Sequence, residues 1–408
     1  MSTALPTLES LDVAGKTVLV RLDLNVPMQA GRVIDSSRIA RAVPTLQYLI
    51  ERHAKVVVMS HLGRPKSFDP AHSLAPLVDV LSEALWDRPV KFAPDCVGNA
   101  AKLAVSNADA GDIVLMENLR FHAAEEANDA AFGKALAELA DCYVNDAFSC
   151  SHRAHASIVG VNPYLPSAAG RLMQEEVEAL GSVLTSPARP LVAMVGGSKI
   201  STKLDLLGNL TKRVDKLVIG GAMANTFLMA QGVGVGASLA EADMLATARE
   251  ILATAQQNGC RILLPCDVVV ANHLKPHAAN MVCDIAAIPA DGKILDIGPD
   301  SLMRLCREIA ECKALVWNGP LGAYEIAPFD CATTQLARFV AKRTREGQLH
   351  SVAGGGDTVA ALANAGLSAQ LSYLSTAGGA FLEWLEGKEL PGIAALLHAQ
   401  PSARRAQA

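Results

Sequence analysis

The stretch LVAMVGGSKISTK, residues 191–203, is an apolar run that ends in a glycine turn followed by two lysines. The stretch SVAGGGDT, residues 351–358, repeats the arrangement, and a helix-like pattern follows each turn. Glycines let backbone N–H groups approach phosphate oxygens, and the N-terminus of the next helix adds a partial positive charge. Cations and an oxygen ligand for Mg²⁺ would come from the polar residues Lys199, Lys203, Asp357 and Thr358. The two stretches predict a nucleotide site in the second half of the chain.

The rest of the chain shows the same alternation of short apolar runs and helical patterns. In the first half the apolar runs are residues 17–23, 55–60, 113–117 and 142–148. The rhythm restarts at 190–196 and continues through 216–221, 261–271, 314–319, 350–356 and 372–378. Strands that alternate with helices are typical of βαβ units. The predicted fold class is therefore α/β, with two doubly wound, Rossmann-like parallel sheets.

The length of 408 residues favours two domains, since one hydrophobic core rarely grows that large. An amphipathic stretch at residues 170–190, closed by Pro187 and Pro190, is predicted to be a connecting helix with a loop after it. The expected division is an N-terminal domain at 1–172, a linker helix and hinge at 173–189, and a C-terminal domain at 190–390. Residues 391–408 are expected to dock back on the first domain, with a frayed end.

Composition limits the partners of the protein. The formal net charge of −5 disfavours general affinity for nucleic acid, so an anionic substrate needs local positive clusters. The nine cysteines include no CxxC pair and are expected to be reduced. The start MSTALPTLES has no signal-peptide pattern, and no apolar run reaches the about 18 residues that cross a bilayer. We expect a cytoplasmic protein with no membrane or nucleic-acid partner.

Polar side chains follow the predicted strands of the first half. Arg21, Asp23 and Asn25 alternate along an extended segment, so they share one face at a strand end. Basic residues follow three further strands, namely His61, Arg64, Arg120, His152 and Arg153. Ligands of open α/β sheets bind beyond the carboxyl ends of the strands. The sequence therefore predicts a site for a small anion there. His155, with His152, lacks a carboxylate or cysteine to complete a metal site and is left out.

Other motifs in the second half exclude several nucleotide-binding classes. The GxxxxGK[ST] loop is absent, as are HRDxxxxN and DFG of protein kinases. Residues 232–237 match GxGxxA but follow a helical stretch rather than a strand, which argues against a dinucleotide site. In WNGPLGAYE, residues 317–325, a strand and a turn lead to Glu325, which suits a ribose contact or a plain loop equally well.

The ordered motifs of the chain resemble the phosphoglycerate kinase family over almost its whole length. They are RLDLNVP, SHLGRP, ENLRFH, SHRAHAS, GRLMQEE, GGSKISTK, GGAMANTF, LPCDVVVA, LDIGPDS, WNGPLGAYE, GGGDT and STAGGAFLEWLEGKELPG. The resemblance implies a 3-phosphoglycerate site made of Arg21, Asp23, Asn25, Arg38, His61, Leu62, Gly63, Arg64, Arg120, His152 and Arg153. It implies a nucleotide site made of Gly197, Lys199, Lys203, Gly220, Gly221, Leu295, Asn318, Pro320, Glu325, Gly354, Gly355, Gly356, Asp357 and Thr358.

The resemblance also implies the activity, which is reversible phosphoryl transfer between 1,3-bisphosphoglycerate and ADP in glycolysis and gluconeogenesis. Asp357 would hold Mg²⁺ and Glu325 the ribose. The catalytic residues implied are Arg38, Lys199, Lys203, Gly355 and Gly356. The resemblance further implies a monomer whose partners are these small molecules, with Mg-ATP or Mg-ADP as the nucleotide. Ser149-Cys150-Ser151 and His155 depart from the family pattern.

Substrate motifs in one half and nucleotide motifs in the other predict closure about a hinge, with flexing at the helix that contains Glu175 and at Ser375-Thr376. Two other classes stay open on the residues alone. An NAD-dependent dehydrogenase would bind NAD rather than ATP, and a two-lobed solute-binding protein would show no turnover.

Overall fold

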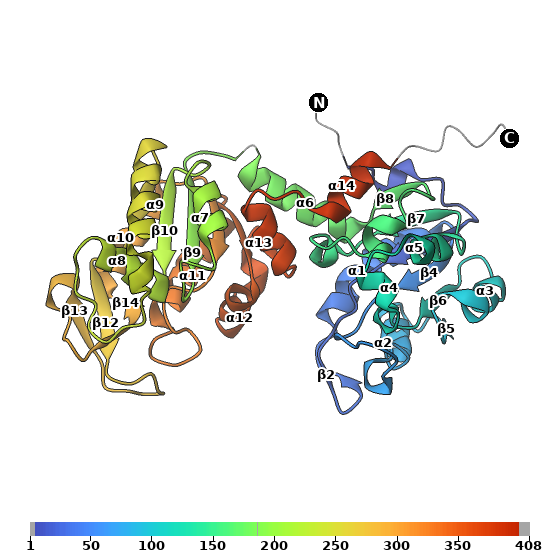
Figure 1. Cartoon of the computed structure of the whole chain (residues 1–408), viewed down its shortest axis with the longest axis horizontal. Coiled ribbons are helices and arrows are strands. Elements are labelled where there is room, and N and C mark those ends of the chain that lie inside the picture. The colour runs from blue at the N-terminus through green and yellow to red at the C-terminus, as the bar shows by residue number, and fades with distance from the viewer. Residues whose placement is uncertain (1–4, 186, 400–408) are drawn as a thin grey trace. The chain divides into compact units, whose positions relative to one another are not determined.

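The structure, a computed structural model, describes residues 5–185 and 187–399 (Figure 1). The described residues divide into two compact units, the first drawn from Met1–Val177 and Glu389–Ala408 and the second from Glu178–Lys388. The division falls inside helix α6, Arg171–Leu184. Each unit contains its own six-stranded sheet in which every pair of neighbours is parallel. The predicted α/β fold with two parallel sheets is confirmed.

The sheet of the first unit has the strand order β5-β6-β4-β1-β7-β8. Its strands are β1 Thr17–Arg21, β4 Lys55–Met59, β5 Val90–Ala93, β6 Ile113–Met116, β7 Cys142–Asn145 and β8 Ser167–Ala169. The helices are α1 Ser37–Glu51, α2 Leu77–Ala84, α3 Gly98–Ser106, α4 Ala123–Glu126 and α5 Ala130–Ala137, and β2 Met28–Gln29 pairs with β3 Arg32–Val33. The short strands β5 and β8 at the two edges were not among the predicted apolar runs.

Both faces of this sheet are covered, as the doubly wound fold requires. Val18 and Val20 of β1 belong to the apolar core that includes Leu46 of α1. Leu19, between them, belongs to a second core that includes Leu136 of α5. Successive side chains of a strand point to opposite faces, so a run without polar interruptions is buried on both sides. The all-apolar strands of the sequence therefore fit a central position in the sheet.

The main sheet of the second unit has the order β11-β10-β9-β15-β16-β17. Its strands are β9 Leu191–Gly196, β10 Lys216–Gly220, β11 Arg261–Leu263, β15 Ala314–Asn318, β16 His350–Gly354 and β17 Tyr373–Ser375. The helices are α7 Leu204–Leu210, α8 Ala222–Ala230, α9 Leu245–Gln257, α10 Pro299–Ala310, α11 Cys331–Arg345, α12 Gly356–Asn364 and α13 Gly379–Leu385. Every helix in residues 5–185 and 187–399 is too short or too polar to span a membrane.

One part of the strand prediction is wrong. Residues 261–271 were expected to continue a single parallel sheet, but they form two strands in different sheets. β12, Asp267–Ala271, lies between β13, Met281–Asp284, and β14, Lys293–Ile297, in a small antiparallel sheet. Pro265 precedes the second strand, and a proline has no N–H to continue a ladder. The antiparallel partners lie farther along the chain, which local periodicity cannot reveal.

Helix α14, Pro391–His398, belongs to the first unit, although it follows the second in sequence. The backbone N–H of Gly392 donates to the carbonyl of Ser151 at 2.9 Å. A Cβ at residue 392 would lie only 2.8 Å from the Ser151 hydroxyl oxygen, so the close approach requires glycine. The predicted frayed end at 401–408 lies outside the described residues.

Each unit buries one carboxyl group whose titration is expected to make stability depend on pH. Burial raises the pKa of Asp146, beside Met173, to about 7, and burial likewise raises the pKa of Asp296 to about 7. In the folded chain such a carboxyl group stays protonated up to about pH 7, whereas in the unfolded chain the same group ionises above about pH 3.8. Its contribution to stability is therefore complete below about pH 4 and is lost as pH rises to about 7.

Wild type should lose stability from Asp146 as the pH rises from about 4 to about 7, whereas Asp146→Asn has no such group to titrate. The free energy of unfolding of the variant minus that of wild type, measured by urea titration, should therefore increase by up to about 4 kcal/mol over this pH range. The amide keeps an oxygen that can accept the N–H of Met173, which now donates to Asp146 at 3.1 Å. Asp12→Asn is the matched control, because Asp12 is exposed and pairs with Lys16, whose hydrogen bond lowers the Asp12 pKa. A difference between Asp146→Asn and wild type that does not change with pH would refute the assignment.

Candidate functional site

Arg21 is the central cation of a polar cluster in the first unit. It is the last residue of β1 and is only 1% exposed. Its Nε donates to the Ser157 hydroxyl at 2.9 Å, and that hydroxyl donates to the fully buried Glu125 carboxylate at 2.5 Å. A buried charge is stable only when it is paired or hydrogen-bonded. Glu125 therefore supplies the counter-charge that holds Arg21 in one orientation.

His61 lies against Arg21 and is neutral. Burial lowers its pKa well below the usual value, and the fields of Arg21 and Arg120 lower it further. An Arg21 Nη2 group lies 3.1 Å from His61 Nδ1. Because a guanidinium can only donate, Nδ1 must accept, so the ring proton is on Nε2. The imidazole therefore offers an N–H donor beside a cluster of arginines, which suits a bound anion.

Three loops bring further polar groups to the cluster. Asp23 Oδ2 accepts hydrogen bonds from Arg38, at the start of α1, and from the Ser149 hydroxyl. Asn25 Oδ1 accepts the N–H of Gly63 at 2.9 Å. Sequence spacing alone gave no sign of Arg38, because the contact with Asp23 joins a loop to a helix. Ser149, a departure from the family pattern, takes part in the cluster through this hydroxyl.

The other predicted residues of the first unit lie in the neighbouring loops. Arg120 donates to the Gly63 carbonyl at 2.5 Å and pairs with Glu126 at 3.2 Å. Arg153 Nε donates to His152 Nε2 at 3.2 Å, and Arg64 is exposed beyond β4. Leu62 is buried, and its carbonyl accepts from the Asn118 side chain at 2.8 Å. The structure thus joins Arg21, Asp23, Asn25, Arg38, His61, Gly63 and Arg120 by hydrogen bonds.

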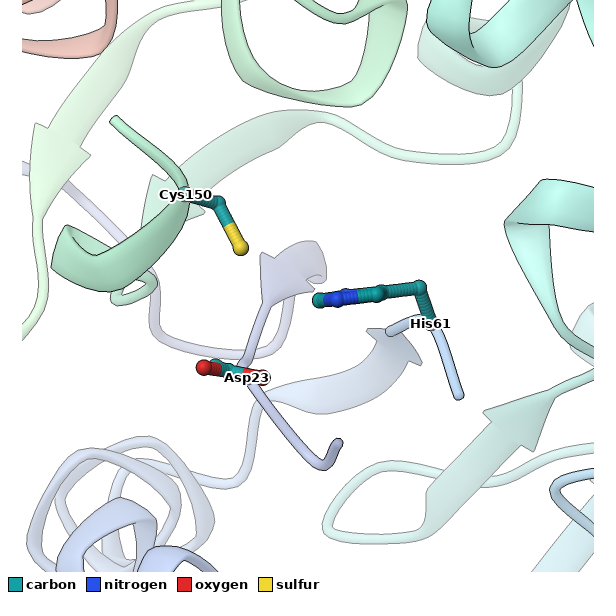
Figure 2. A group of neighbouring side chains, drawn as sticks. All are labelled: Asp23, His61 and Cys150. Carbon is teal, nitrogen blue, oxygen red and sulfur yellow. The ribbon is translucent and has the colours of Figure 1, made fainter. Parts of the chain in front are cut away.

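Figure 2 shows that Asp23, His61 and Cys150 come from three segments and point toward one region. One atom of each lies within 4.8 Å of the others, which is close enough for a metal ion. However, Arg38 pairs with Asp23, and Arg21 contacts both His61 and Cys150. These guanidiniums oppose a cation and favour an anion. His155, which is not among the predicted site residues, is buried, and its Nδ1 atom lies 3.8 Å from Oε1 of Glu125.

The second unit contains a cavity of 790 Å³ beyond the carboxyl ends of β9, β10 and β15. Of the predicted nucleotide residues, Gly197, Gly221, Leu295, Pro320, Glu325 and Asp357 line it. Gly221 has φ of +67°, and a Cβ there would lie 2.6 Å from the Gly197 carbonyl oxygen. Only glycine allows the two turns to approach so closely. Leu239, Leu274 and Tyr324 also line the cavity and carried no local signal in the sequence.

Lys203 and the second glycine turn are held together by Asn318. Lys203 Nζ donates to Asn318 Oδ1 at 2.6 Å, and Asn318 Nδ2 donates to the Gly354 carbonyl at 3.0 Å. Gly355 caps α12 with φ of +94°, and Gly356 begins that helix, so its N-terminal N–H groups lie beside this lysine-bearing network. Burial lowers the pKa of Lys203, while Lys199 is exposed.

Asp357 and Thr358 have different roles in this turn. The Thr358 hydroxyl accepts the N–H of Gly319 at 2.6 Å and is 1% exposed, so it holds two loops together. Asp357 is exposed on the cavity wall in the first turn of α12. Mg²⁺ is bound through one or two carboxylates together with waters and substrate phosphates. The single carboxylate of Asp357 fits that ligand set.

The arginine-rich cluster of one α/β unit and the glycine-lined cavity of the other fit the class of two-domain kinases that act on small molecules. Residues 8–388 match the family model described as phosphoglycerate kinase. The phosphoglycerate kinases of Cereibacter sphaeroides and Granulibacter bethesdensis are each 57% identical over 391 residues, covering 96% of this chain and 98% of theirs. The chain belongs to the phosphoglycerate kinase family, and its activity is phosphoglycerate kinase activity.

Solved structures agree with this assignment. The phosphoglycerate kinase from Coxiella burnetii is 42% identical, with a TM-score of 0.90, and the match covers 97% of this chain and all of that one. The kinase from Pyrococcus horikoshii is 31% identical, with a TM-score of 0.80 over 96% of this chain and 98% of that one. The similarity thus extends over both units.

Proposed function

We propose that the chain transfers a phosphoryl group directly and in line between the carboxyl phosphate of 1,3-bisphosphoglycerate and ADP, giving 3-phosphoglycerate and ATP. The observation that carries the proposal is the buried Arg21, held by Glu125 through Ser157 and paired with a neutral His61. Such an arrangement presents fixed donors to a small anion. The charge-assisted hydrogen bonds it offers are each worth about 1.5–3 kcal/mol.

The substrate phosphate and carboxylate would be held by the guanidiniums and donors of the first unit. These are Arg21, Arg38, His61, Arg64, Arg120, His152 and Arg153, with Leu62 and Gly63 forming the loop between them. Asp23 and Asn25 would lie near the substrate hydroxyl. An acceptor carboxylate with a pKa of about 3.5 is already ionised at neutral pH, so the reaction needs no general base.

The nucleotide would occupy the cavity of the second unit, with Glu325 at the ribose. Gly197, Gly221, Leu295 and Pro320 would form its walls, with Gly220 at the end of β10 directly before Gly221, and the loop from Gly354 to Thr358 would lie at its phosphates. Asp357 would hold Mg²⁺, which when bound offsets the charge of the phosphate oxygens. Lys199, Lys203, Arg38 and the N–H groups of Gly355 and Gly356 would stabilise the transferring group.

Closure about a hinge is part of the proposal, because the substrate residues and the nucleotide residues belong to different units. The α6 helix around Glu175 and the segment Ser375-Thr376 would flex. Small-angle scattering should show a smaller radius of gyration with both ligands bound than with either alone. An unchanged radius would count heavily against closure.

The central test is turnover of ATP with 3-phosphoglycerate and Mg²⁺, read by coupling the acyl phosphate to NADH oxidation through glyceraldehyde-3-phosphate dehydrogenase. We expect turnover that disappears when ATP, 3-phosphoglycerate or Mg²⁺ is omitted. ATP binding without turnover would show that the acceptor is misassigned. Turnover in the absence of Mg²⁺ would refute the role of Asp357.

We further propose a cytoplasmic monomer whose partners are these small molecules, with no nucleic-acid or membrane partner. The net charge of −5 supports the absence of nucleic-acid binding. Light scattering should give the mass of one chain. A stable mass of two chains would contradict the monomer.

A further inference from the structure

Asp95, Cys96 and His122 form a second group of potential metal ligands, outside the proposed substrate residues. Asp95 and Cys96 lie between β5 and α3. His122 follows the short 3-10 helix Leu119–Phe121 and precedes α4. One carboxylate oxygen, the thiol sulfur and one ring nitrogen lie within 4.8 Å of one another. Tertiary structure thus brings oxygen, nitrogen and sulfur donors together from two separate segments.

The three side chains are already positioned by contacts with the rest of the first unit. Asp95 Oδ1 lies 2.8 Å from His122 Nε2 and accepts the N–H of Cys96 at 2.7 Å. The His122 ring packs on Phe132, with the ring centres 5.1 Å apart. Cys96 is completely buried, whereas the side chains of Asp95 and His122 are 42% and 33% exposed. An ion can therefore reach the group from solvent and meet a thiol fixed in the core.

The charge around this group differs from that around Asp23, His61 and Cys150. There, Arg38 pairs with Asp23, and Arg21 contacts His61 and Cys150. Asp95, by contrast, pairs with His122, and no arginine or lysine within residues 5–185 and 187–399 forms a salt bridge with it. A cation at Asp95 would replace the proton in the hydrogen bond between Asp95 and His122, and would not have to displace an arginine paired with this carboxylate. Of the two groups, the one at Asp95 is the one suited to a metal.

We propose that Asp95, Cys96 and His122 bind one Zn²⁺ ion, with a water molecule as the fourth ligand. Mixed carboxylate, imidazole and thiolate donors suit borderline-soft divalent ions such as Zn²⁺ better than Mg²⁺. Bonds of about 2.0–2.3 Å place tetrahedral ligand atoms about 3.5 Å apart, so Asp95 Oδ1 and His122 Nε2, now 2.8 Å apart, must separate slightly while the thiol stays within reach. The exposed Asp95 and His122 side chains can rotate to do this. The thiol proton leaves to solvent as the metal–sulfur bond forms.

Bound metal would connect the β5–α3 loop to the segment that carries Arg120, two residues before His122. Arg120 donates to the carbonyl of Gly63, so this segment also borders the proposed substrate cluster. The ion would stabilise the first unit by binding the folded chain and not the unfolded one. It is thus a structural site, separate from the carboxylate proposed to hold Mg²⁺ in the second unit.

Titration of the full chain with Co²⁺ tests the proposal, because a cobalt–thiolate bond has a strong near-ultraviolet absorption. We expect one Co²⁺ ion to bind per chain and to give this absorption band. Added Zn²⁺ should abolish the band by displacing Co²⁺, whereas excess Mg²⁺ should leave the band unchanged. Cys96→Ser should lose the band, and the matched control Cys150→Ser, altered in the other group, should keep it. The surface variant His122→Gln should bind at least about tenfold more weakly.

A second measurement does not depend on the absorption band. Added Zn²⁺ should raise the midpoint of thermal unfolding of wild type and of Cys150→Ser, and should raise that of His122→Gln clearly less at the same Zn²⁺ concentration. If Cys96→Ser does not fold, His122→Gln and Asp95→Asn, both altered at partly exposed positions, decide the question. A band lost in Cys150→Ser but kept in Cys96→Ser would overturn the proposal, as would the absence of any thiolate band.

Discussion

Replacing Arg38 with alanine is expected to lower kcat by about 10²- to 10³-fold while changing the affinity for ATP only a few-fold. Arg38 lies in the first turn of α1 and pairs with Asp23 in the polar cluster of the first unit. Its guanidinium is proposed to offset charge on the transferring phosphoryl group. Removal of a donor that acts mainly in the transition state lowers kcat. The coupled assay with both substrates varied measures this effect.

Two variants make the Arg38 result specific. Arg38→Lys keeps the charge but not the planar fork, so part of the lost kcat should return. Arg153→Ala should mainly raise KM for 3-phosphoglycerate, since Arg153 lies against His152 at the edge of the cluster. Equal small effects of Arg38→Ala and Arg153→Ala would refute both assignments.

Replacing Lys199 with alanine is expected to lower kcat by a similar factor of about 10²–10³. Lys199 is exposed in the turn after β9, so its removal should leave the fold intact. Its ammonium is proposed to meet the transferring group together with Lys203. The measurement is the same coupled assay, with thermal unfolding as the check on folding.

Lys212→Ala is the matched control, because Lys212 is another exposed lysine of the same unit, beyond the end of α7. Its turnover should equal that of wild type. Lys203→Ala should lower kcat as well, but it also removes the donor to Asn318 and should cost some stability. Wild-type kcat in Lys199→Ala would show that this lysine does not meet the phosphoryl group.

Some features of this chain follow from neighbouring residues in the sequence, and others follow only from tertiary contacts. The turn at Gly355 illustrates the first kind, because a glycine after an apolar run and before a helix predicts its own geometry, here a helix cap with φ of +94°. Asp296 illustrates the second kind. Its sequence neighbours gave no sign that burial would raise its pKa, because Ala332, whose N–H it accepts, follows 36 residues later.

The two parallel sheets, the glycine turns and the strand ends that carry Arg21 and Asp23 could be predicted from the sequence alone. These features depend on periodicity and on the conformational limits of single residues, which neighbours along the chain reveal. Tertiary contacts were needed to show that Glu125 supports Arg21 through Ser157, that β12 joins a small antiparallel sheet, and that His122 lies beside Cys96. Each of these features depends on contacts between segments far apart in the chain. The burial and charge of a residue at such a contact depend on its neighbours in space, which local sequence patterns do not encode.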